Sequence, residues 1–571
     1  MERRTFAIWS VGVGLLLGLL ANIFFFGRTI GVSFPLFVLL AVIAVLASSR
    51  PARQTLRRRN LWPLLPLLFF AGMVAVRADS LIVMLDILAV LALGGLVLYY
   101  LPLAHRLDED SFIQHTTNTL EAGLELPRYA VIEAGDAWSW LREKRHQRGG
   151  AFAAVMRGLV FAAPVILVFV LLLGSADAVF AKYLDQVWQS LRDLLGLDGI
   201  PDMFARLLFT LLIAALGTGA LGYAWVRRER IRPVVRVPQY MAVGNTVAPM
   251  PDSPAAEADA TAADETALEA EAKAKPGMKL GMIETGIILG SVVALFALFV
   301  VIQFAYFFGG QATISVAGLT YAQYARRGFF ELVAVLVLTL GLALGLDRVT
   351  VRQERPEQIT FRTLCVLLVG LTTVMLVSAS QRMLLYEEAF GFTQLRVYTH
   401  VFIHWLGVLF LVFLAALFRL RKNIFSLGSL LVIIGYLVTM NLLNVDFYIA
   451  ERNIARYQNG ADLDVAFLNI LSADAVPAVV PLFRETPDNN VKYWAGQWLV
   501  RQQLLLKNDR QDASVFSLNA AREIAWGQLT VIDRLLPEYD PSAYFESYDF
   551  WNETYGLDDR SGWETDPTPG P

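Results

Sequence analysis

Two histidines spaced by one helical turn are the residues best suited to chemistry in this chain. The chain has five histidines among 571 residues, and His400 and His404 stand in the same apolar run. Residues four apart share a helix face, so both imidazoles can reach one ligand. With Glu331 or Glu387 they would form a mixed histidine and carboxylate shell for a divalent metal. Two alternatives stay open: a proton-linked role, and histidines that bond to neighbouring helices.

Further polar residues cluster where apolar segments begin or end. A charge at the bilayer centre costs about 2.5–3.5 kcal/mol, so such residues usually face a cavity or a partner. Asn441, Asn444, Tyr448 and Glu451 follow one another at spacings of three, four and three, which predicts a single helical face. The candidate ligand-binding cluster comprises Arg326, Arg327, Glu331, Arg382, Glu387, His400, His404, Asn441, Asn444 and Glu451. No catalytic residue is assigned.

Two further polar features have two interpretations each, and two glycine patterns have one. Arg326 and Arg327 either pair with Glu331 and the acidic tail or bind an anion or a lipid headgroup. Asp86 either belongs to an ion path or sits against a polar group of another helix. Gly14-x-x-x-Gly18 and Gly341-x-x-x-Gly345 predict close helix packing and carry no functional information.

The elements that must position these residues are membrane helices. The chain is 56% hydrophobic and 17% charged, against about 25% charged in soluble domains. A span needs roughly 20 apolar residues. About eleven runs qualify or nearly do: 6–26, 32–48, 61–78, 81–103, 159–180, 204–226, 282–308, 329–346, 364–385, 397–418 and 425–443. The second, third and eighth are short, so one of them can be re-entrant. The expected fold is an all-α polytopic bundle.

Basic residues predict the orientation of this bundle. Clusters of arginine and lysine follow the second, fourth, sixth, eighth and tenth runs. Cytoplasmic loops carry the excess of such residues, so we expect the N-terminus inside and the C-terminus outside. The pair Arg326-Arg327 departs from this pattern.

The chain divides into five predicted regions. Residues 1–245 form six spans, with a cytoplasmic loop at 104–157 whose Trp-rich, basic stretch suits either an interfacial helix or a solvated loop helix. Residues 246–277 form a disordered acidic cytoplasmic linker, and 278–457 form five spans. Residues 458–536 form an extracytoplasmic helical domain, followed by an extended or disordered tail at 537–571.

Composition also bounds the partners and cofactors. From Asp446 onward there are 20 acidic and 10 basic residues, so we expect this region to bind an envelope protein partner at the outer face. We expect the apolar runs to contact the lipid bilayer. Nothing indicates nucleic-acid binding. The single cysteine excludes a disulfide within the chain. No phosphate-loop, zinc-protease or nucleophile-elbow motif occurs, and no cofactor is identified apart from the divalent metal considered above.

Several motifs in the second half suggest a family. They are Tyr324-Ala-Arg-Arg-Gly-Phe-Phe-Glu-Leu332, Tyr398-Thr-His-Val-Phe-Ile-His-Trp405, Asn441-x-x-Asn-x-Asp446, Ala450-Glu-Arg-Asn-Ile-Ala-Arg-Tyr457 and Leu471-Ser-x-Asp-Ala-Val-Pro477. Over roughly residues 304–480 the chain resembles bacterial multi-pass membrane proteins grouped as a domain of unknown function. The resemblance implies a bacterial plasma membrane and brings no established activity.

The sequence therefore leaves three functions open. The first is a non-enzymatic plasma-membrane protein with a sensing, scaffolding or envelope-related role and a polar vestibule at its outer face. The second is a transporter of a small solute or ion, against which the apolar inner halves of the last five spans count. The third is an outer-face membrane enzyme acting on a lipid-linked substrate, with His400, His404 and Glu331 as candidates.

Overall fold

The fold is known from a computed structural model of the whole chain. The structure describes every residue except 1, 53–59, 102–109, 145–199, 232–240, 244–245, 249–279, 309–328, 419–422, 512–513, 539 and 541–571. The predicted fifth span, nearly all of the predicted linker and nearly all of the predicted tail lie outside the described residues.

The described chain is helical apart from one small hairpin. In the first half, α1 (Glu2–Phe25), α2 (Ser33–Ala47), α3 (Leu64–Val74), α4 (Ser80–Tyr100), α5 (Phe112–Lys144) and α8 (Ile200–Ile231) pack together. The hairpin joins β1 (Met241–Val243) to β2 (Thr246–Ala248) in antiparallel register. The second half contains α10 (Met282–Phe308), α13 (Phe329–Val349), α14 (Arg355–Phe390), α15 (Gln394–Leu417) and α16 (Ile424–Leu443).

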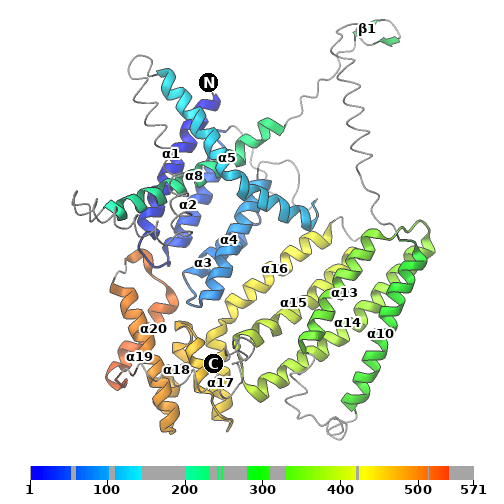
Figure 1. The fold of residues 1–571 in the computed structure, drawn as a ribbon, viewed down its shortest axis with the longest axis vertical. Coiled ribbons are helices and arrows are strands. Elements are labelled where there is room, and N and C mark those ends of the chain that lie inside the picture. The colour runs from blue at the N-terminus through cyan, green and yellow to red at the C-terminus, as the bar shows by residue number, and fades with distance from the viewer. Residues whose placement is uncertain are drawn as a thin grey trace, which may run out of the picture.

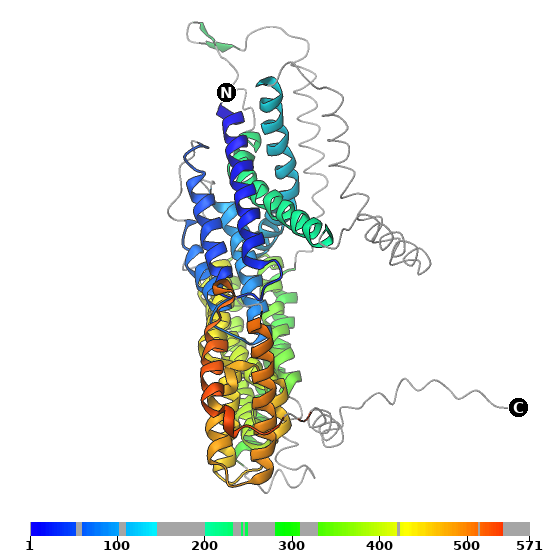
Figure 2. The ribbon, with the colours of Figure 1, turned by 90° about the vertical axis from the view of Figure 1, so that its left-hand side faces the viewer.

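Shorter helices follow α16. They are α17 (Val445–Gln458), α18 (Val476–Glu485), α19 (Asn489–Gln511) and α20 (Ala520–Ile532), with 3₁₀ turns at Val465–Ile470, Ala473–Ala475, Val515–Ser517 and Asp533–Leu535. We call α17–α20 with these turns the C-terminal helices. They lie at the lower left of Figure 1, below α1–α3 and beside the end of α16. The N-terminus lies at the opposite, upper end of the bundle (Figures 1 and 2).

Eight helices are long and apolar enough to cross a membrane, judged by length and composition within the described residues. They correspond to the predicted first, fourth, sixth and last five spans, including the eighth, Leu332–Val349. The helices α2 and α3, with 15 and 11 residues, are shorter, as their apolar runs predicted. The predicted fold class, an all-α bundle with several helices that can cross a membrane, is therefore confirmed.

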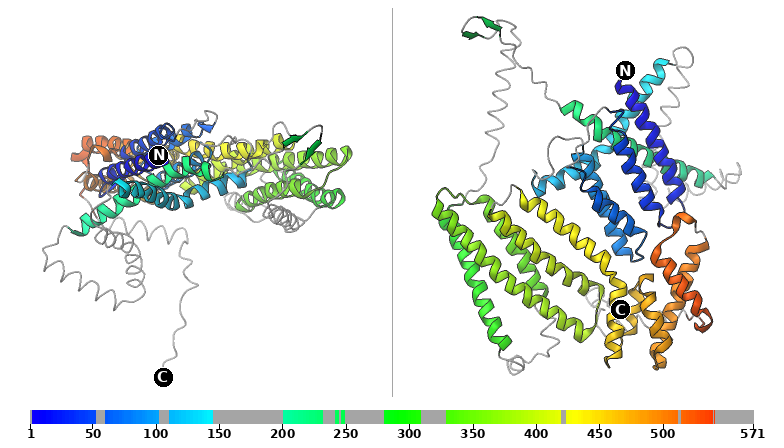
Figure 3. Two further views of the ribbon diagram at one scale, coloured as in Figure 1. Left: turned by 90° about the horizontal axis from the view of Figure 1, so that it is seen from above. Right: turned by 180° about the vertical axis from the view of Figure 1, so that it is seen from behind.

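The outer surface of the bundle is apolar. Leu65, Ile283, Leu338 and Leu411 are each between 63% and 81% exposed. A water-soluble surface rarely gathers such side chains over many helices, whereas lipid solvates them readily. Seen from above, the helices form a thin layer (Figure 3), which leaves most of them with one or both flanks uncovered by protein.

Glycine allows α1 and α8 to cross closely. A Cβ atom at Gly14 would overlap Thr218, and one at Gly18 would overlap the carbonyl oxygen of Thr210, so α1 meets α8 backbone to backbone. The other predicted pair behaves differently, because no described atom lies within 4 Å of a Cβ built at Gly341 or Gly345.

The helix α5 lies within the predicted cytoplasmic loop at 104–157. It has 33 residues and buries Ala122, Tyr129 and Ala130 on its packed side, in or beside a core shared with α1 and α8. Its other side exposes Leu124 and Val131. This amphipathic division suits an interfacial helix, and it also suits a helix that packs one side on protein and turns the other to solvent.

Candidate functional site

The predicted cluster is only partly described. Arg326 and Arg327 lie outside the described residues, and Glu331 belongs to the first turn of α13. Arg382 lies in α14, and Glu451 is exposed on α17. The remaining residues separate into two polar groups, one around His400 and one around Asn441.

The first group joins α14 to α15. Nδ1 of His400 lies 3.0 Å from Oε2 of Glu387, and its Nε2 lies 3.2 Å from Oγ of Ser380. Glu387 is 2% exposed. The two helices run antiparallel about the turn at Gly391, which brings residues before the turn beside residues after it. Sequence reasoning named Glu387 and His400 but missed Ser380, which this antiparallel register would have brought into view.

The two ring nitrogens of His400 bind different partners, and this determines what the imidazole can do chemically. In the tautomer that carries its proton on Nδ1, His400 donates this proton to Oε2 of Glu387. Nε2 is then free to accept the Ser380 hydroxyl proton. This is the arrangement that activates a serine nucleophile, and it also matches the interpretation of histidines that bond to neighbouring helices.

His404 takes a different role from His400. Its Nδ1 donates to the backbone oxygen of His400 at 2.8 Å, and the two rings lie with centroids 5.2 Å apart. Within the part of the chain that the structure describes, no three histidine, cysteine, aspartate or glutamate side chains are grouped to hold a metal. The predicted metal shell is thus represented by one histidine–carboxylate contact, between His400 and Glu387.

The second group joins the two halves of the bundle. Nδ2 of Asn441 in α16 donates to Oδ1 of Asp86 in α4 at 2.7 Å. The guanidinium of Arg77, from the loop between α3 and α4, donates through Nε to the backbone oxygen of Asn441 at 2.9 Å and also through Nη2. Asp86 therefore sits against a polar group of another helix, which is one of the two alternatives that the sequence left open.

Asn444 breaks the predicted helical face. Its φ of 51° and ψ of 73° place it in the left-handed region, so α16 ends at Leu443 and α17 begins at Val445. Asparagine tolerates this conformation better than most residues. Asn441 and Glu451 consequently lie on separate helices, and the prediction of one continuous face from 441 to 451 is wrong.

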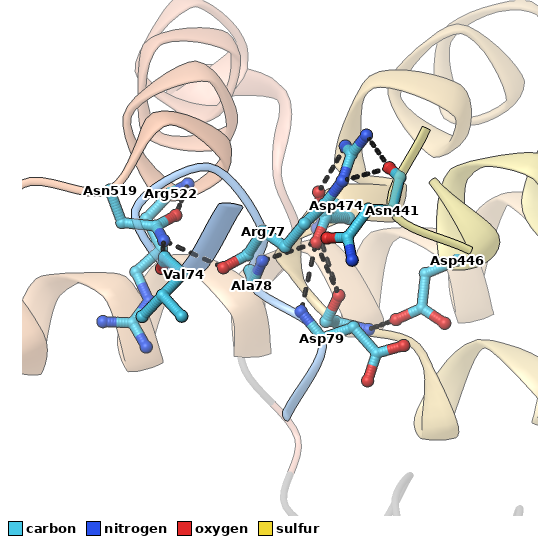
Figure 4. Close-up of polar contacts among 10 residues, drawn as sticks. Val74, Arg77, Ala78, Asp79, Asn441, Asp446, Asp474, Asn519 and Arg522 are labelled. Atoms are coloured by element: carbon cyan, nitrogen blue, oxygen red, sulfur yellow. Dashed lines mark hydrogen bonds and ion pairs between the residues drawn. The ribbon is translucent and has the colours of Figure 1, made fainter. Parts of the chain in front are cut away.

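A buried aspartate of the C-terminal helices lies beside this group (Figure 4). Oδ2 of Asp474 accepts the backbone N–H groups of Ala78 at 2.6 Å and of Asp79 at 3.1 Å. Its Oδ1 lies 3.6 Å from Nη1 of Arg77. Burial raises the pKa of Asp474, while the Ala78 N–H and the Arg77 guanidinium lower it. The loop between α3 and α4 is thereby held to the C-terminal helices.

A second buried aspartate begins α17. Oδ1 of Asp446 accepts Nε2 of Gln394 at 2.7 Å, and its Oδ2 accepts the N–H of Ser472 at 2.8 Å. Burial, and secondly the nearby carboxylate of Asp79, raise the pKa of Asp446 to about 6. Asp79 itself accepts the hydroxyl of Tyr398 at 3.1 Å. Asp446 therefore connects α15 to α17 and to the turn that carries Asp474.

The start of α20 makes a third attachment. Nδ2 of Asn519 donates to the backbone oxygens of Val74 at 3.2 Å and Arg77 at 2.9 Å, while its Oδ1 caps α20 by accepting the N–H of Arg522. The N–H of Ala520 donates to the oxygen of Ala75 at 2.8 Å. We call the contacts of Arg77, Asp79, Asp446, Asp474 and Asn519 the domain junction.

The domain junction was almost invisible in the sequence. Its partners are 396 residues apart for Ala78 and Asp474, and 445 apart for Val74 and Asn519. Asp446 and Asp474 stand in two of the motifs that carry the family resemblance, which was the one available signal. Asp79, Asp86, Asp446 and Asp474 are each at most 5% exposed, so this region holds an excess of buried carboxyl groups over the Arg77 guanidinium.

Comparison with known proteins places the chain in a family. The model of a domain of unknown function, DUF4153, matches residues 14–482. The chain belongs to the DUF4153 family. The match begins in α1 and ends in α18, so it covers both halves of the bundle, His400, Asp86 and Asp474, and it is wider than the motifs at 304–480 predicted. No curated protein and no solved structure matches the chain.

Proposed function

We propose that this member of the DUF4153 family is a scaffolding or sensing protein of the bacterial cytoplasmic membrane. In this proposal about eleven spans cross the membrane, the N-terminus lies inside, and the C-terminal helices form an extracytoplasmic domain. Two observations support the orientation. Basic clusters follow the even-numbered apolar runs, and the N-terminus lies at the end of the bundle opposite the C-terminal helices (Figure 1).

The observation that carries this function is the domain junction. A domain that merely hung from the last span would contact the bundle through one linker. Here the C-terminal helices bond to the loop before α4 through Asp474 and Asn519, and to α15 through Asp446. A partner bound to them would therefore act on both halves of the bundle. The exposed surface of the C-terminal helices and the candidate vestibule around Arg382 and His400 provide the proposed contact sites.

The orientation is tested with single cysteines in a chain whose own cysteine is removed by Cys365→Ser. Lys507→Cys, exposed on α19, should react with an impermeant thiol reagent in intact cells stripped of any outer membrane. Arg348→Cys, exposed at the end of α13, should react only after lysis. The reverse pattern would overturn the topology.

The scaffold itself is tested with photo-crosslinking residues at Leu505 and Val531, which are 49% and 74% exposed. We expect both positions to capture the same envelope protein in the wild-type chain. A Gly31→Ala chain should lose this capture, because a Cβ at Gly31 would overlap the carbonyl oxygen of Leu518 and displace the start of α20. Gly12→Ala, whose Cβ meets no described atom within 4 Å, is the matched control. Absence of a shared partner would overturn the proposal.

A second candidate function is an outer-face enzyme that cleaves acyl esters of lipids. The contact order Ser380–His400–Glu387 supports it. Oγ of Ser380 would attack the ester carbonyl while Nε2 of His400 takes the hydroxyl proton and returns it to the leaving alcohol. Water would then release the fatty acid from the acyl-serine. Ser380 lies ten residues, roughly 15 Å, before the end of α14.

This candidate is tested by labelling membranes with a fluorophosphonate. Labelling should disappear in Ser380→Ala and fall strongly in His400→Gln, and it should persist in Ser378→Ala, which removes a hydroxyl two residues away on the same helix. Labelling that survives Ser380→Ala, or that never occurs, would exclude this chemistry.

A further inference from the structure

Two buried oxygen atoms between α4 and α16 need a common explanation. Oδ2 of Asp86 and Oδ1 of Asn441 have no hydrogen-bond partner among the described residues. Asp86 is 0% exposed and Asn441 is 1% exposed. The other polar atoms of the same two groups are bonded to each other, since Nδ2 of Asn441 donates to Oδ1 of Asp86 at 2.7 Å. Buried acceptors without a donor are unfavourable and rare in folded proteins.

One proton would satisfy both atoms. A carboxylic acid and a primary amide can form a ring of two hydrogen bonds, from the amide N–H to the acid carbonyl and from the acid O–H to the amide carbonyl. The first bond of this ring is present. A proton on Oδ2 of Asp86 supplies the donor that Oδ1 of Asn441 lacks. Without this proton, both oxygen atoms remain buried acceptors that lack a donor.

The surrounding charges do not supply a substitute. Arg77 directs Nε and Nη2 to the backbone oxygen of Asn441 and Nη1 to Asp474. Asp79 and Asp446 add two further buried carboxyl groups, and Tyr398 donates to Asp79. An ionised Asp86 would therefore be a buried charge in a region already rich in carboxylates, which is the most costly state for such a group.

We propose that Asp86 and Asn441 form a proton-binding site that joins the two halves of the bundle. Asp86 binds the proton on Oδ2 and shares it with the Asn441 amide. Asn441 is the third residue from the end of α16 and Asp86 the seventh residue of α4, so the site lies on the side of the domain junction. The proton exchanges with that side. Loss of this proton leaves Oδ2 of Asp86 and Oδ1 of Asn441 both as acceptors without a donor, which weakens the contact of α4 with α16.

The Asp86→Asn variant provides a sharp test because it mimics the protonated acid. The new amide N–H can donate to Oδ1 of Asn441 where the acid O–H did, and the ring is kept. We expect the melting temperature of Asp86→Asn in lipid nanodiscs at neutral pH to lie within about 2 °C of the wild type. At alkaline pH the wild type should lose stability that Asp86→Asn retains. Asp86→Leu, which has no polar atom, should melt lower at every pH.

Infrared spectroscopy detects the proton directly. In potassium buffer without sodium, the wild type should show the carbonyl stretch of a buried protonated carboxyl, which shifts in heavy water. The band should be absent in Asp86→Asn and unchanged in Asp202→Asn, a control at an exposed residue of α8. In Asn441→Leu the band should move because its hydrogen bond is lost, which keeps the test valid if Asp86→Asn fails to fold.

Three results would overturn the proposal. One is the absence of any carboxyl band that depends on Asp86. Another is a folded Asp86→Asn protein that melts far below the wild type at neutral pH, which would mean that the negative charge is needed. The third is stabilisation of the wild type, but not of Asp86→Asn, when sodium replaces potassium, because the two oxygens would then ligate sodium instead of sharing a proton.

Discussion

Two buried networks of charged side chains differ in how many buried carboxyl groups each holds per guanidinium group. At one end of the first half, Nη2 of Arg3 in α1 pairs at 2.9 Å with both Glu133 and Asp136 of α5, and Ser10 donates to Glu133 at 3.2 Å. Only Glu133 is buried there, since the side chain of Asp136 is 40% exposed. At the other end, the region of the domain junction buries four aspartates around Arg77.

Because of this difference, we expect the stability of the first network to be independent of pH and that of the second to depend on pH. One buried carboxylate facing one guanidinium needs no further charge, so the Arg3–Glu133 network can hold α1 to α5 without protons. An excess of buried carboxyl groups must bind protons or another cation, so the stability of the domain junction follows pH. Burial raises the pKa of Glu133 as well, but the Arg3 guanidinium opposes this directly.

The largest expected effect is that of Asp474→Ala. The substitution leaves the N–H groups of Ala78 and Asp79 and one nitrogen of Arg77 without their acceptor. Breaking a buried charged contact costs about 3–5 kcal/mol, so the C-terminal helices should detach and become sensitive to protease. Asp462→Ala, at an exposed position, is the control. Equal protease resistance of the two variants would show that the junction contributes little.

An intermediate effect is expected for Glu133→Gln. The neutral amide oxygen still accepts from Ser10 or Arg3, but the charge pairing with Arg3 is lost, at a cost of about 1–3 kcal/mol in thermal or denaturant unfolding. Asp136→Asn removes the more exposed partner and should cost less than about 1 kcal/mol. If both variants lose the same stability, the burial of Glu133 is not what makes this network strong.

The smallest expected effect is the pH dependence carried by Asp446. Its pKa rises from 3.8 to about 6 on folding, so its contribution is complete below about pH 4 and is lost as pH rises through about 6. Between pH 5 and pH 7.5 the wild type should therefore lose about 1 kcal/mol that Asp446→Asn does not lose. Chemical unfolding at the two pH values measures this. If the wild type is equally stable at both pH values, the domain junction does not depend on pH more than the Arg3–Glu133 network does.

The sequence predicted what local patterns can determine. Apolar runs identified the membrane helices, and an antiparallel helix pair joined at Gly391 made the contact of Glu387 with His400 foreseeable. Periodicity could not reveal the left-handed conformation of Asn444, because the amino-acid spacing is the same in a continuous and a broken helix. Nor could it reveal Arg77 or Asn519, whose partners depend on how distant helices assemble.

The sequence distances across the domain junction also set an order of biosynthesis. Residues 74–79 leave the ribosome nearly 400 residues before Asp474, so the loop between α3 and α4 must wait, with its N–H groups uncapped, until the last segment of the chain has been made. A nascent chain that stops before Asp474 can insert its helices but cannot form the domain junction. The domain junction is therefore complete only after Asn519 has been made, and a chain interrupted earlier lacks part of it.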